Sequence, residues 1–155
     1  MTQLLIDDYL RGPTLLRAAV QGMSREQLLA KPVLGTWSTL QVIAHIADFE
    51  PVYADRMKRV IAEDQPLLMA GDPDLFAARL AYEERDLEEE LNLISAVRRH
   101  VARILLAQSP EVFARTGQHN RDGSLSLEVL LRRVTGHIPH HLKFIADKRR
   151  ALGLS

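Results

Sequence analysis

The feature that most constrains this chain is an apolar, helix-periodic run that contains three of the protein's six histidines. Its apolar side chains recur with the period of an α-helix and fall on one stripe: Leu127, Leu130, Leu131, Val134, Ile138 and Ile145. His137 and His141 lie in the middle of this stripe, four residues apart, and His140 lies on its flank. A helix of this kind buries its apolar face, so these two histidines are expected to point into the core.

Two imidazoles at this spacing can bind one metal ion, as the two histidines of the HExxH pattern do. An imidazole without a partner is costly in a core, so each ring needs either a ligand or a hydrogen bond. The spacing alone leaves both open, including a bundle in which His137 and His141 are simply packed. An open catalytic site takes three protein ligands and a water, so a third histidine from elsewhere in the chain is needed.

Composition narrows the class of protein. At 155 residues the chain is predicted to form one domain, residues 1–155, with a substantial core. Basic and acidic residues are equal in number, which argues against nucleic acid, and no apolar run is long enough to span a membrane. The N-terminus lacks the basic start of a signal peptide, so a cytoplasmic protein is expected. Cysteine is absent, which leaves His, Asp or Glu to hold any metal.

Periodic stretches along the chain predict an all-α protein, with sites built between facing helices of a four-helix bundle. Ser38 and Gln41 form a capping-box pattern that starts the second main helix. An interruption is expected at Gly12-Pro13 and a kink at Pro139. No strand alternation is apparent. The expected segments are a helix over 3–21, a helix from 39 onward, a linker over 62–73, a long periodic stretch over 74–108, a loop over 116–124 and a last helix over 127–150.

Two residues of the second main helix have unusual positions. His45 falls on its narrower polar side, which alone suggests a solvated histidine. Glu50 falls within the apolar arc just before Pro51, and is expected either to pair with a buried arginine or to reach a site. The acidic run over 83–90 and the arginines over 98–103 are interpreted as a solvated face that suits the helix dipole.

The order and spacing of two segments resemble the DinB/YfiT-like superfamily. The first is a Trp-Ser helix start followed by His45-Ile46-Ala47-Asp48-Phe49-Glu50; the second runs from Gly117-Gln118-His119 through Gly123-Ser124-Leu125-Ser126-Leu127 to His137-x-x-x-His141. The resemblance covers nearly the whole chain. It implies a four-helix bundle of up-down-down-up topology and a divalent metal, zinc or nickel, held by His45, His137 and His141. His45 would then face a wet cleft between helices.

The resemblance also implies a reaction class, because its members include thiol-dependent S-transferases and a mycothiol-dependent isomerase. The leading hypothesis is a metal-dependent enzyme that activates a low-molecular-weight thiol for transfer to a small-molecule electrophile. The alternatives are metal-assisted hydrolysis, and a non-catalytic metal-binding or stress-response module that acts through a partner or as a homodimer. Related sequences often carry an acidic residue where this chain has Ile138, so a proton-handling group is missing there.

Several residues are predicted to assist the metal ligands. Glu50, His119 and His140 are candidates for substrate contact or proton transfer. Asp48 and Gln41 are candidates to accept the second ring N–H of His45, since metal-bound imidazoles usually donate that hydrogen to a neighbouring acceptor.

Overall fold

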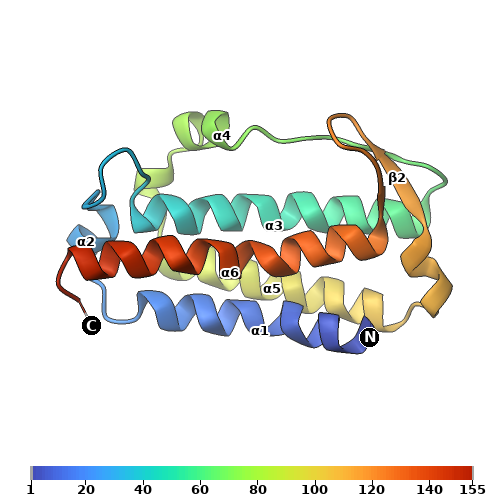
Figure 1. The fold of residues 1–155 in the computed structure, drawn as a ribbon, viewed down its shortest axis with the longest axis horizontal. Coiled ribbons are helices and arrows are strands. Elements are labelled where there is room, and N and C mark those ends of the chain that lie inside the picture. Colours follow the sequence, from blue (N-terminus) through green and yellow to red (C-terminus); the bar gives the residue numbers. More distant parts are fainter. Residues whose placement is uncertain (1, 155) are drawn as a thin grey trace.

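The computed structural model describes residues 2–154, and its four long helices lie side by side as a bundle (Figure 1). These helices are α1 (Thr2–Val20), α3 (Thr39–Ala62), α5 (Leu87–Leu106) and α6 (Leu127–Ala151). Helices α1 and α6 run in one direction and α3 and α5 in the other, and each of α1 and α3 packs against both α5 and α6. The predicted all-α bundle and its up-down-down-up topology are confirmed.

Short polar patterns fix where the helices begin. Ser38 Oγ accepts a hydrogen bond from the Gln41 N–H, and Gln41 Oε1 accepts one from the Ser38 N–H. This reciprocal pair is the predicted capping box, which satisfies two backbone donors at the start of α3. Ser24 makes the same arrangement at α2 (Arg25–Leu29), and Ser126 caps α6. The cap at Ser38 sets the position of His45, two turns into α3.

The expected interruption at Gly12-Pro13 is wrong, because α1 continues through both residues. A proline at position 13 cannot donate a hydrogen bond to the carbonyl of Tyr9. Arg98 Nη1 supplies the missing donor from α5, at 2.8 Å from Tyr9 O. The side chain of Arg98 reaches this carbonyl because Gly12 has no Cβ: a methyl group there would collide with the guanidinium. Helix α6 is likewise continuous through Pro139.

The connection between α3 and α5 runs back along the outside of α3 (Figure 1). It contains β1 (Leu67–Leu68), α4 (Pro73–Arg79) and a 3-10 turn, η1 (Tyr82–Glu84). The single periodic stretch expected over 74–108 is therefore wrong. The chain leaves the helical path at Ala81, which has a left-handed φ of 52°, and Asp86 caps α5 as a new helix by accepting from the Glu89 N–H.

The loop expected over 116–124 is also wrong, because this segment pairs as a hairpin. Strands β2 (Thr116–His119) and β3 (Gly123–Ser126) are antiparallel, and β1 pairs with β2 in parallel, with Leu68 opposite His119. The η2 turn (Pro110–Ala114) leads into β2. Strands this short carry too few residues to show alternation. The small sheet joins the connection between α3 and α5 to the hairpin, and it holds His119 opposite Leu68.

The core consists of two apolar clusters, one toward the hairpin end and one toward the α2 end. Arg98 and Glu50 lie between them with no exposed surface. Arg98 Nε and Nη2 donate to Glu50 Oε1, and Nη2 also donates to the carbonyl of Val134 on α6. With its contact to Tyr9, this one side chain links all four long helices. Glu50 thus pairs with a buried arginine, one of its two predicted roles.

None of the helices within residues 2–154 is both long enough and apolar enough to cross a membrane.

Candidate metal centre

Helices α3 and α6 run antiparallel and bring three histidines together midway along the bundle. The Nε2 atom of His137 lies 2.9 Å from Nε2 of His45 and 3.1 Å from Nε2 of His141. Ligand atoms of all three rings lie within 4.8 Å of one another. The structure therefore joins the pair predicted from the helical stripe to the third histidine implied by the family resemblance.

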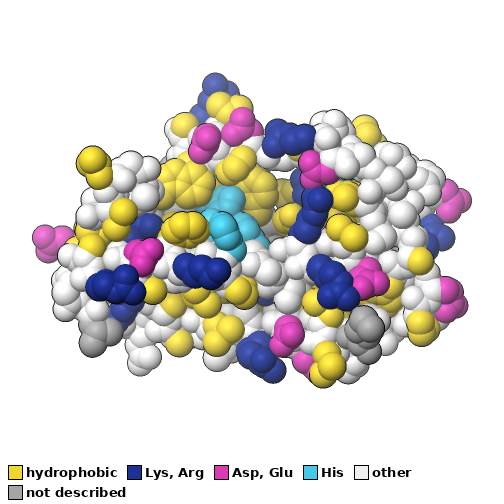
Figure 2. Space-filling view, viewed as in Figure 1, with side chains coloured by type: hydrophobic (Ala, Val, Ile, Leu, Met, Phe, Trp, Pro, Cys, Tyr) yellow, Lys and Arg dark blue, Asp and Glu magenta, His cyan; other side chains and the backbone are white. Residues whose placement is uncertain are grey.

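The three rings form the floor of a hollow that is open on one side (Figure 2). His45 is 6% exposed, so the solvated position suggested by its helical face is wrong. Aromatic rings cover it, with ring centroids 5.2 Å away at Trp37 and 4.8 Å away at Phe49. Phe76 on α4 stacks against Phe49 at 5.2 Å and extends this apolar wall. The connection between α3 and α5 thus encloses the histidines.

Burial keeps the three imidazoles neutral. Desolvation lowers the pKa of His45 to about 4 and that of His141 to about 4. The pKa of His137 falls to about 2, first through burial and then through its closeness to His141 and His45. A neutral imidazole offers a lone pair, and a protonated one does not. At neutral pH, the three rings are therefore in the form that binds a metal ion.

The arrangement of the nitrogens fits a divalent ion. The Nε2 atom of His137 lies against those of both His45 and His141, and hydrogen bonds between neutral rings cannot satisfy all three at once. Two histidine nitrogens bound tetrahedrally at 2.0–2.1 Å would lie about 3.3 Å apart, close to the 2.9 and 3.1 Å observed. Among the described residues, no carboxylate joins this group. An all-imidazole set suits zinc, nickel, copper or iron, so the donor type does not select the metal.

The Nδ1 atoms of His45 and His137 do not make the hydrogen bonds that the sequence predicts. Nδ1 of His45 and Nδ1 of His137 are buried without a hydrogen-bond partner. Asp48 does not accept from His45, because Arg85 holds both its oxygens at 3.1 Å. Gln41 is occupied by the capping box and by Glu83. The prediction that Asp48 or Gln41 orients His45 is therefore wrong, and the aromatic packing around the ring sets its orientation instead.

The other predicted site residues do not join the metal centre. Glu50 has no exposed surface and is paired with Arg98, so its predicted role in substrate contact or proton transfer is corrected to a structural one. His140 is exposed beside the cluster, with its ring centroid 5.1 Å from that of His141 and 5.2 Å from that of Phe144. His119 lies in the hairpin, outside the three-histidine group. For His140 and His119, contact with substrate stays a prediction.

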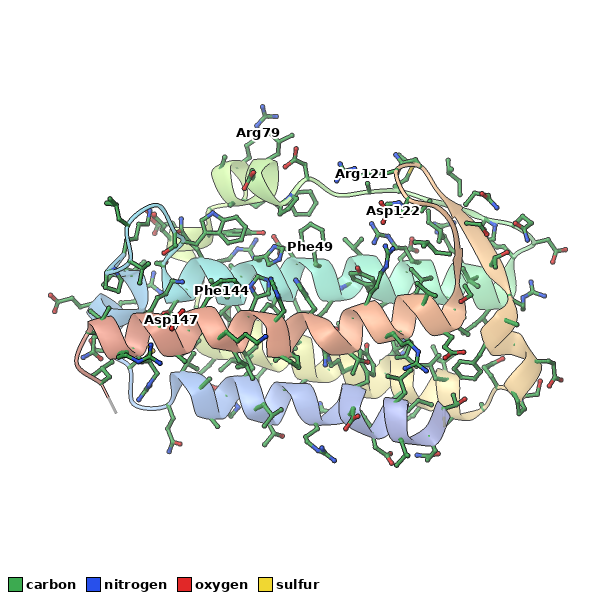
Figure 3. The ribbon with its side chains drawn as sticks, in the orientation of Figure 1. Phe49, Arg79, Arg121, Asp122, Phe144 and Asp147 are labelled. Carbon is green, nitrogen blue, oxygen red and sulfur yellow. The ribbon has the colours of Figure 1, made fainter. Side chains whose placement is uncertain are left out.

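The sequence does not predict that Trp37, Phe49 and Phe76 form an aromatic wall beside the histidines. In the sequence, Trp37 is recognisable only as part of a helix start, and Phe76 lies in a segment whose path depends on tertiary contacts. The one sequence signal for Phe49 is its position one turn after His45 on the same helix face. Figure 3 shows Phe49 and Phe144 on facing helices at the hollow.

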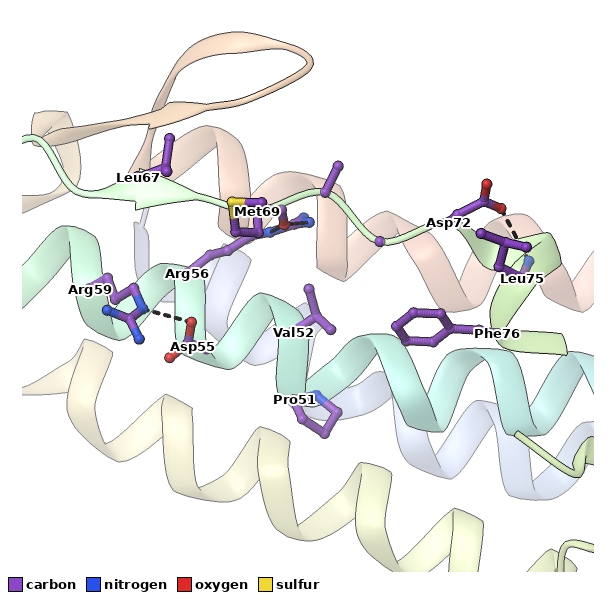
Figure 4. Close-up of a pocket in the computed structure, with 12 residues that line it drawn as sticks. Pro51, Val52, Asp55, Arg56, Arg59, Leu67, Met69, Asp72, Leu75 and Phe76 are labelled. Atoms are coloured by element: carbon purple, nitrogen blue, oxygen red, sulfur yellow. Dashed lines mark hydrogen bonds and ion pairs between the residues drawn. The ribbon is translucent and has the colours of Figure 1, made fainter. Parts of the chain in front are cut away.

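A separate groove of about 870 Å³ lies between α3 and the connection that covers it (Figure 4). The three histidines are not among its lining residues, which include Val52, Met69, Leu75 and Phe76. The contact between Phe76 and Phe49 stands between this groove and the histidines. The metal centre therefore opens through the hollow of Figure 2 and not through this groove.

Comparison with known proteins identifies the family. The sequence pattern of the DinB superfamily matches residues 9–145, a span that includes all three histidines. The chain belongs to the DinB superfamily. A protein of Oceanobacillus iheyensis named "putative metal-dependent hydrolase" is 30% identical over 151 residues, covering 95% of this chain and 87% of the relative. One of the same name from Geobacillus thermodenitrificans is 28% identical and covers 91% of this chain and 80% of the relative.

Two solved structures share the fold. YfiT from Bacillus subtilis, described as a probable metal-dependent hydrolase with an unusual four-helix bundle topology, superposes with a TM-score of 0.93. It is 24% identical, and the match covers 99% of this chain and 89% of YfiT. TT2238, a four-helix bundle protein, superposes with a TM-score of 0.67 at 24% identity and covers 95% of this chain and 99% of its own. At this identity the likeness shows the fold alone.

Proposed function

We propose that this protein is a divalent-metal-dependent enzyme in which His45, His137 and His141 hold the ion and a small-molecule substrate reaches it through the hollow. The observation that carries the proposal is the convergence of three neutral Nε2 atoms on one point beside an open hollow. Three neutral ligands leave a bound ion its full charge and an open position, from which it lowers the pKa of a coordinated group and polarises a carbonyl.

The protein's own residues then shape the reaction. The aromatic wall of Trp37, Phe49 and Phe76 excludes water from one side of the centre and offers an apolar surface to a substrate. Exclusion of water strengthens electrostatic interactions at the site. The packing of α3 against α6 holds the ligands in place without a metal-binding loop. We propose zinc or nickel as the ion on the basis of the family resemblance, because the all-imidazole donor set by itself also suits copper and iron.

Hydrolysis of an ester or amide is the first reaction we propose, and the names of the relatives from Oceanobacillus and Geobacillus support it. Transfer of a low-molecular-weight thiol to an electrophile is the second. One observation favours it: within residues 2–154, no carboxylate joins the group of histidine nitrogens, and Asp48, whose charge reaches His45, is bound by Arg85. A thiol has a pKa of about 8.5 and needs only a small shift to ionise, whereas water needs a much larger one.

The decisive first experiment is metal content, measured by mass spectrometry on tag-free protein incubated with zinc or nickel and then desalted. We expect close to one equivalent in the wild type and less than a tenth of that in His45→Ala, His137→Ala and His141→Ala. His140→Ala is the matched control on the same helix and should keep the metal. Absence of metal in the wild type would contradict the proposal and leave the bundle with packed histidines.

The reaction class is then tested with the metal-loaded protein. Esters and amides are assayed without thiol, and aromatic electrophiles are assayed with and without cysteine as the thiol donor. Turnover that is independent of thiol and lost in His141→Ala supports hydrolysis. Turnover that requires the thiol supports S-transfer. Metal binding with neither activity would favour the non-catalytic metal-binding module, for which action as a homodimer stays a prediction.

A further inference from the structure

A group of basic side chains lies at the hairpin end of the hollow that contains the histidines. It comprises Arg133 on α6, His119 and Arg121 on the hairpin, and Arg56 on α3, which lies near His119 and also lines the groove of Figure 4. We call it the hairpin cation cluster. Figure 2 shows basic side chains on that wall of the hollow, and Figure 3 shows Arg121 and Asp122 at the hairpin tip, on the side facing α4. This cluster has no part in the metal site.

The cluster is aligned with the metal ligands along both helices. Arg133 precedes His137 by one turn of α6, which is about 6 Å of helix rise. Arg56 follows His45 by three turns of α3, about 16 Å of rise, and returns to nearly the same face. Because the two helices are antiparallel, both steps lead in the same direction, toward the hairpin. A molecule that extends along this line can touch the metal centre and the cations together.

Arg56 is a buried cation without a carboxylate partner. Its residue is 7% exposed, and its Nε and Nη2 both donate to one backbone carbonyl, that of Met69, at 3.2 and 2.5 Å. Among residues 2–154, no ion pair includes Arg56. A guanidinium carries five N–H donors; beyond these two bonds, Arg56 also bonds the Tyr53 side chain and lies 5.1 Å from the centroid of its ring, which leaves the remaining donors for an anion. A buried charge with unused donors is costly unless an anion completes its environment.

His119 contributes a further donor. Its Nδ1 accepts hydrogen bonds from the backbone N–H of Arg121 at 3.3 Å and of Asp122 at 3.0 Å. Burial lowers the pKa of His119, and the nearby charges of Arg56 and Arg133 lower it further. A neutral ring whose Nδ1 accepts must carry its hydrogen on Nε2. His119 therefore offers an N–H, held in place by the hairpin backbone, alongside the guanidinium groups.

The charges of the cluster do not cancel. Asp122 is its one carboxylate within the described residues: it binds Arg133 at 2.5 Å and lies 3.8 Å from His119 Nδ1. Three guanidinium groups thus face a single carboxylate. The net positive charge lies next to an apolar, partly desolvated hollow, where a charged hydrogen bond is stronger than in bulk water.

We propose that the hairpin cation cluster binds the anionic end, a carboxylate or a phosphate, of the substrate whose other end binds at the three-histidine centre. The inference rests on the proposed function and specifies its substrate class: an elongated, anionic small molecule with an apolar middle that packs on the aromatic wall. His119, which the sequence singled out for substrate contact, then acts at the far end of the substrate and not at the reacting atoms.

The proposal is tested with three matched probes on the zinc-loaded protein: octanohydroxamic acid and its analogues with a terminal carboxylate or phosphonate. The hydroxamate group binds the metal in all three, and the chain extends toward the hairpin. By calorimetry we expect the anionic probes to bind at least tenfold more tightly than the methyl-ended one, with the advantage shrinking as salt is raised. Whether carboxylate or phosphonate gains more identifies the anion class.

Single substitutions test which residues produce the tighter binding of the anionic probes. Arg133→Gln should reduce the advantage of the anionic probes to less than threefold and leave the affinity of octanohydroxamic acid unchanged. Arg132→Gln is the matched control: it removes the same charge from the adjacent position, where the side chain pairs with Glu128 on the surface. Asp122→Asn should increase the advantage. Equal affinity of all three probes for the wild type, or an equal loss in Arg132→Gln, would overturn the proposal.

A second measurement separates this inference from the proposed function. Inorganic phosphate is titrated into metal-free protein and followed by the NMR signals of His119 and the hairpin amides. Saturable shifts that weaken in Arg133→Gln support the anion site even if no hydroxamate binds, an outcome that would count against the metal-dependent function only. Hydroxamate binding without any advantage for the anionic probes, and without phosphate shifts, would overturn the anion site only.

Discussion

At the scale of single residues, the chemistry of the metal centre depends on what surrounds each imidazole. His137 contacts two other histidines and lies near Arg98, so a proton on its ring would meet both low polarity and positive charge. The same ring would be an ordinary base on the surface. A divalent ion at the proposed site would be shared by the lone pairs of all three rings, so a single cation would serve three buried or half-buried acceptors.

The buried His45 and the half-buried His141 predict how stability depends on pH in the metal-free protein. The unfolded chain takes up protons near the ordinary histidine pKa of 6.5, whereas burial lowers the folded-state pKa of His45 and His141 to about 4. Between these values the unfolded state binds more protons, so the free energy of unfolding is constant above about pH 7.5 and falls as pH drops below 6.5. Each histidine contributes up to about 1.4 kcal/mol per pH unit.

Urea unfolding of metal-free protein at several pH values between 5 and 7.5 measures this slope. His141→Gln should have a smaller slope than the wild type, because one such proton is removed. His100→Gln changes an exposed histidine and serves as control. An equal slope in His141→Gln and wild type would mean that the ring is not buried as the structure shows.

Two glycines in helices predict opposite effects of the same substitution. At Gly12 an added methyl group would collide with the guanidinium of Arg98 and would also meet Ile138. We expect Gly12→Ala to destabilise the protein by about 2–4 kcal/mol, through overpacking and the strained hydrogen bond to Tyr9. Gly136 has no neighbour within 4 Å of such a methyl group.

Gly136→Ala should therefore stabilise α6 by about 0.5–1 kcal/mol, since alanine is the better helix former. Thermal unfolding of both variants compares the two effects directly. A neutral Gly12→Ala variant would show that Arg98 does not pack against Gly12 as described, and a destabilised Gly136→Ala variant would contradict the open space beside Gly136.

At the scale of elements, Arg98 determines how the four helices meet. It donates to Glu50 on α3 and to backbone carbonyls on α1 and α6, and it lies between the two apolar clusters. Its contact with Tyr9 O lets α1 continue past Pro13, and its contact with Val134 O holds α6 one turn before His137. Arg98 is thus a polar group in an otherwise apolar core, and its contact on α6 lies one turn from the metal ligand His137.

Arg98→Met should be strongly destabilising, because it leaves the Glu50 carboxylate buried without its partner. We expect a loss of about 3–5 kcal/mol, as for other broken buried ion pairs. Arg99→Met, at the exposed neighbouring position, should stay within about 0.5 kcal/mol of the wild type. The double variant Arg98→Met/Glu50→Leu should recover part of the loss, since no buried charge remains. Urea unfolding checks all three, and equal losses in Arg98→Met and Arg99→Met would contradict this role.

Local signals in the sequence were sufficient for some elements and not for others. The capping box at Ser38 and Gln41 and the apolar stripe of the last helix depend on neighbours within one or two turns, and both are confirmed. His137 and His141 lie on this stripe half-buried. Strand β2 pairs with its neighbour β3 and also with β1, a segment 51 residues earlier in the chain. The break at Ala81 and the burial of His45 likewise depend on distant contacts, which periodicity does not record.

At the scale of the whole molecule, the metal centre joins halves of the bundle that are far apart in sequence. His45 on α3 and His137 on α6 are separated by 92 positions, and the hairpin and the connection between α3 and α5 lie between them. Any unfolding that separates α3 from α6 dismantles the site. Metal binding therefore adds to the stability of the whole bundle and not of one helix, and unfolding is expected to follow a single transition, as for one domain.

Zinc should raise the melting temperature of the wild type measured by calorimetry. At a free concentration 100 times Kd, binding to the folded state alone adds about 2.7 kcal/mol, which for a domain of this size corresponds to roughly 5–10 °C. A chelator should reverse the shift. His141→Ala should melt at the same temperature with and without zinc, because two imidazoles bind the ion less tightly than three. His140→Ala should show the same zinc-induced rise in melting temperature as the wild type. An increment in His141→Ala equal to that of the wild type would place the ion elsewhere, since exposed histidines such as His140 would then be binding it.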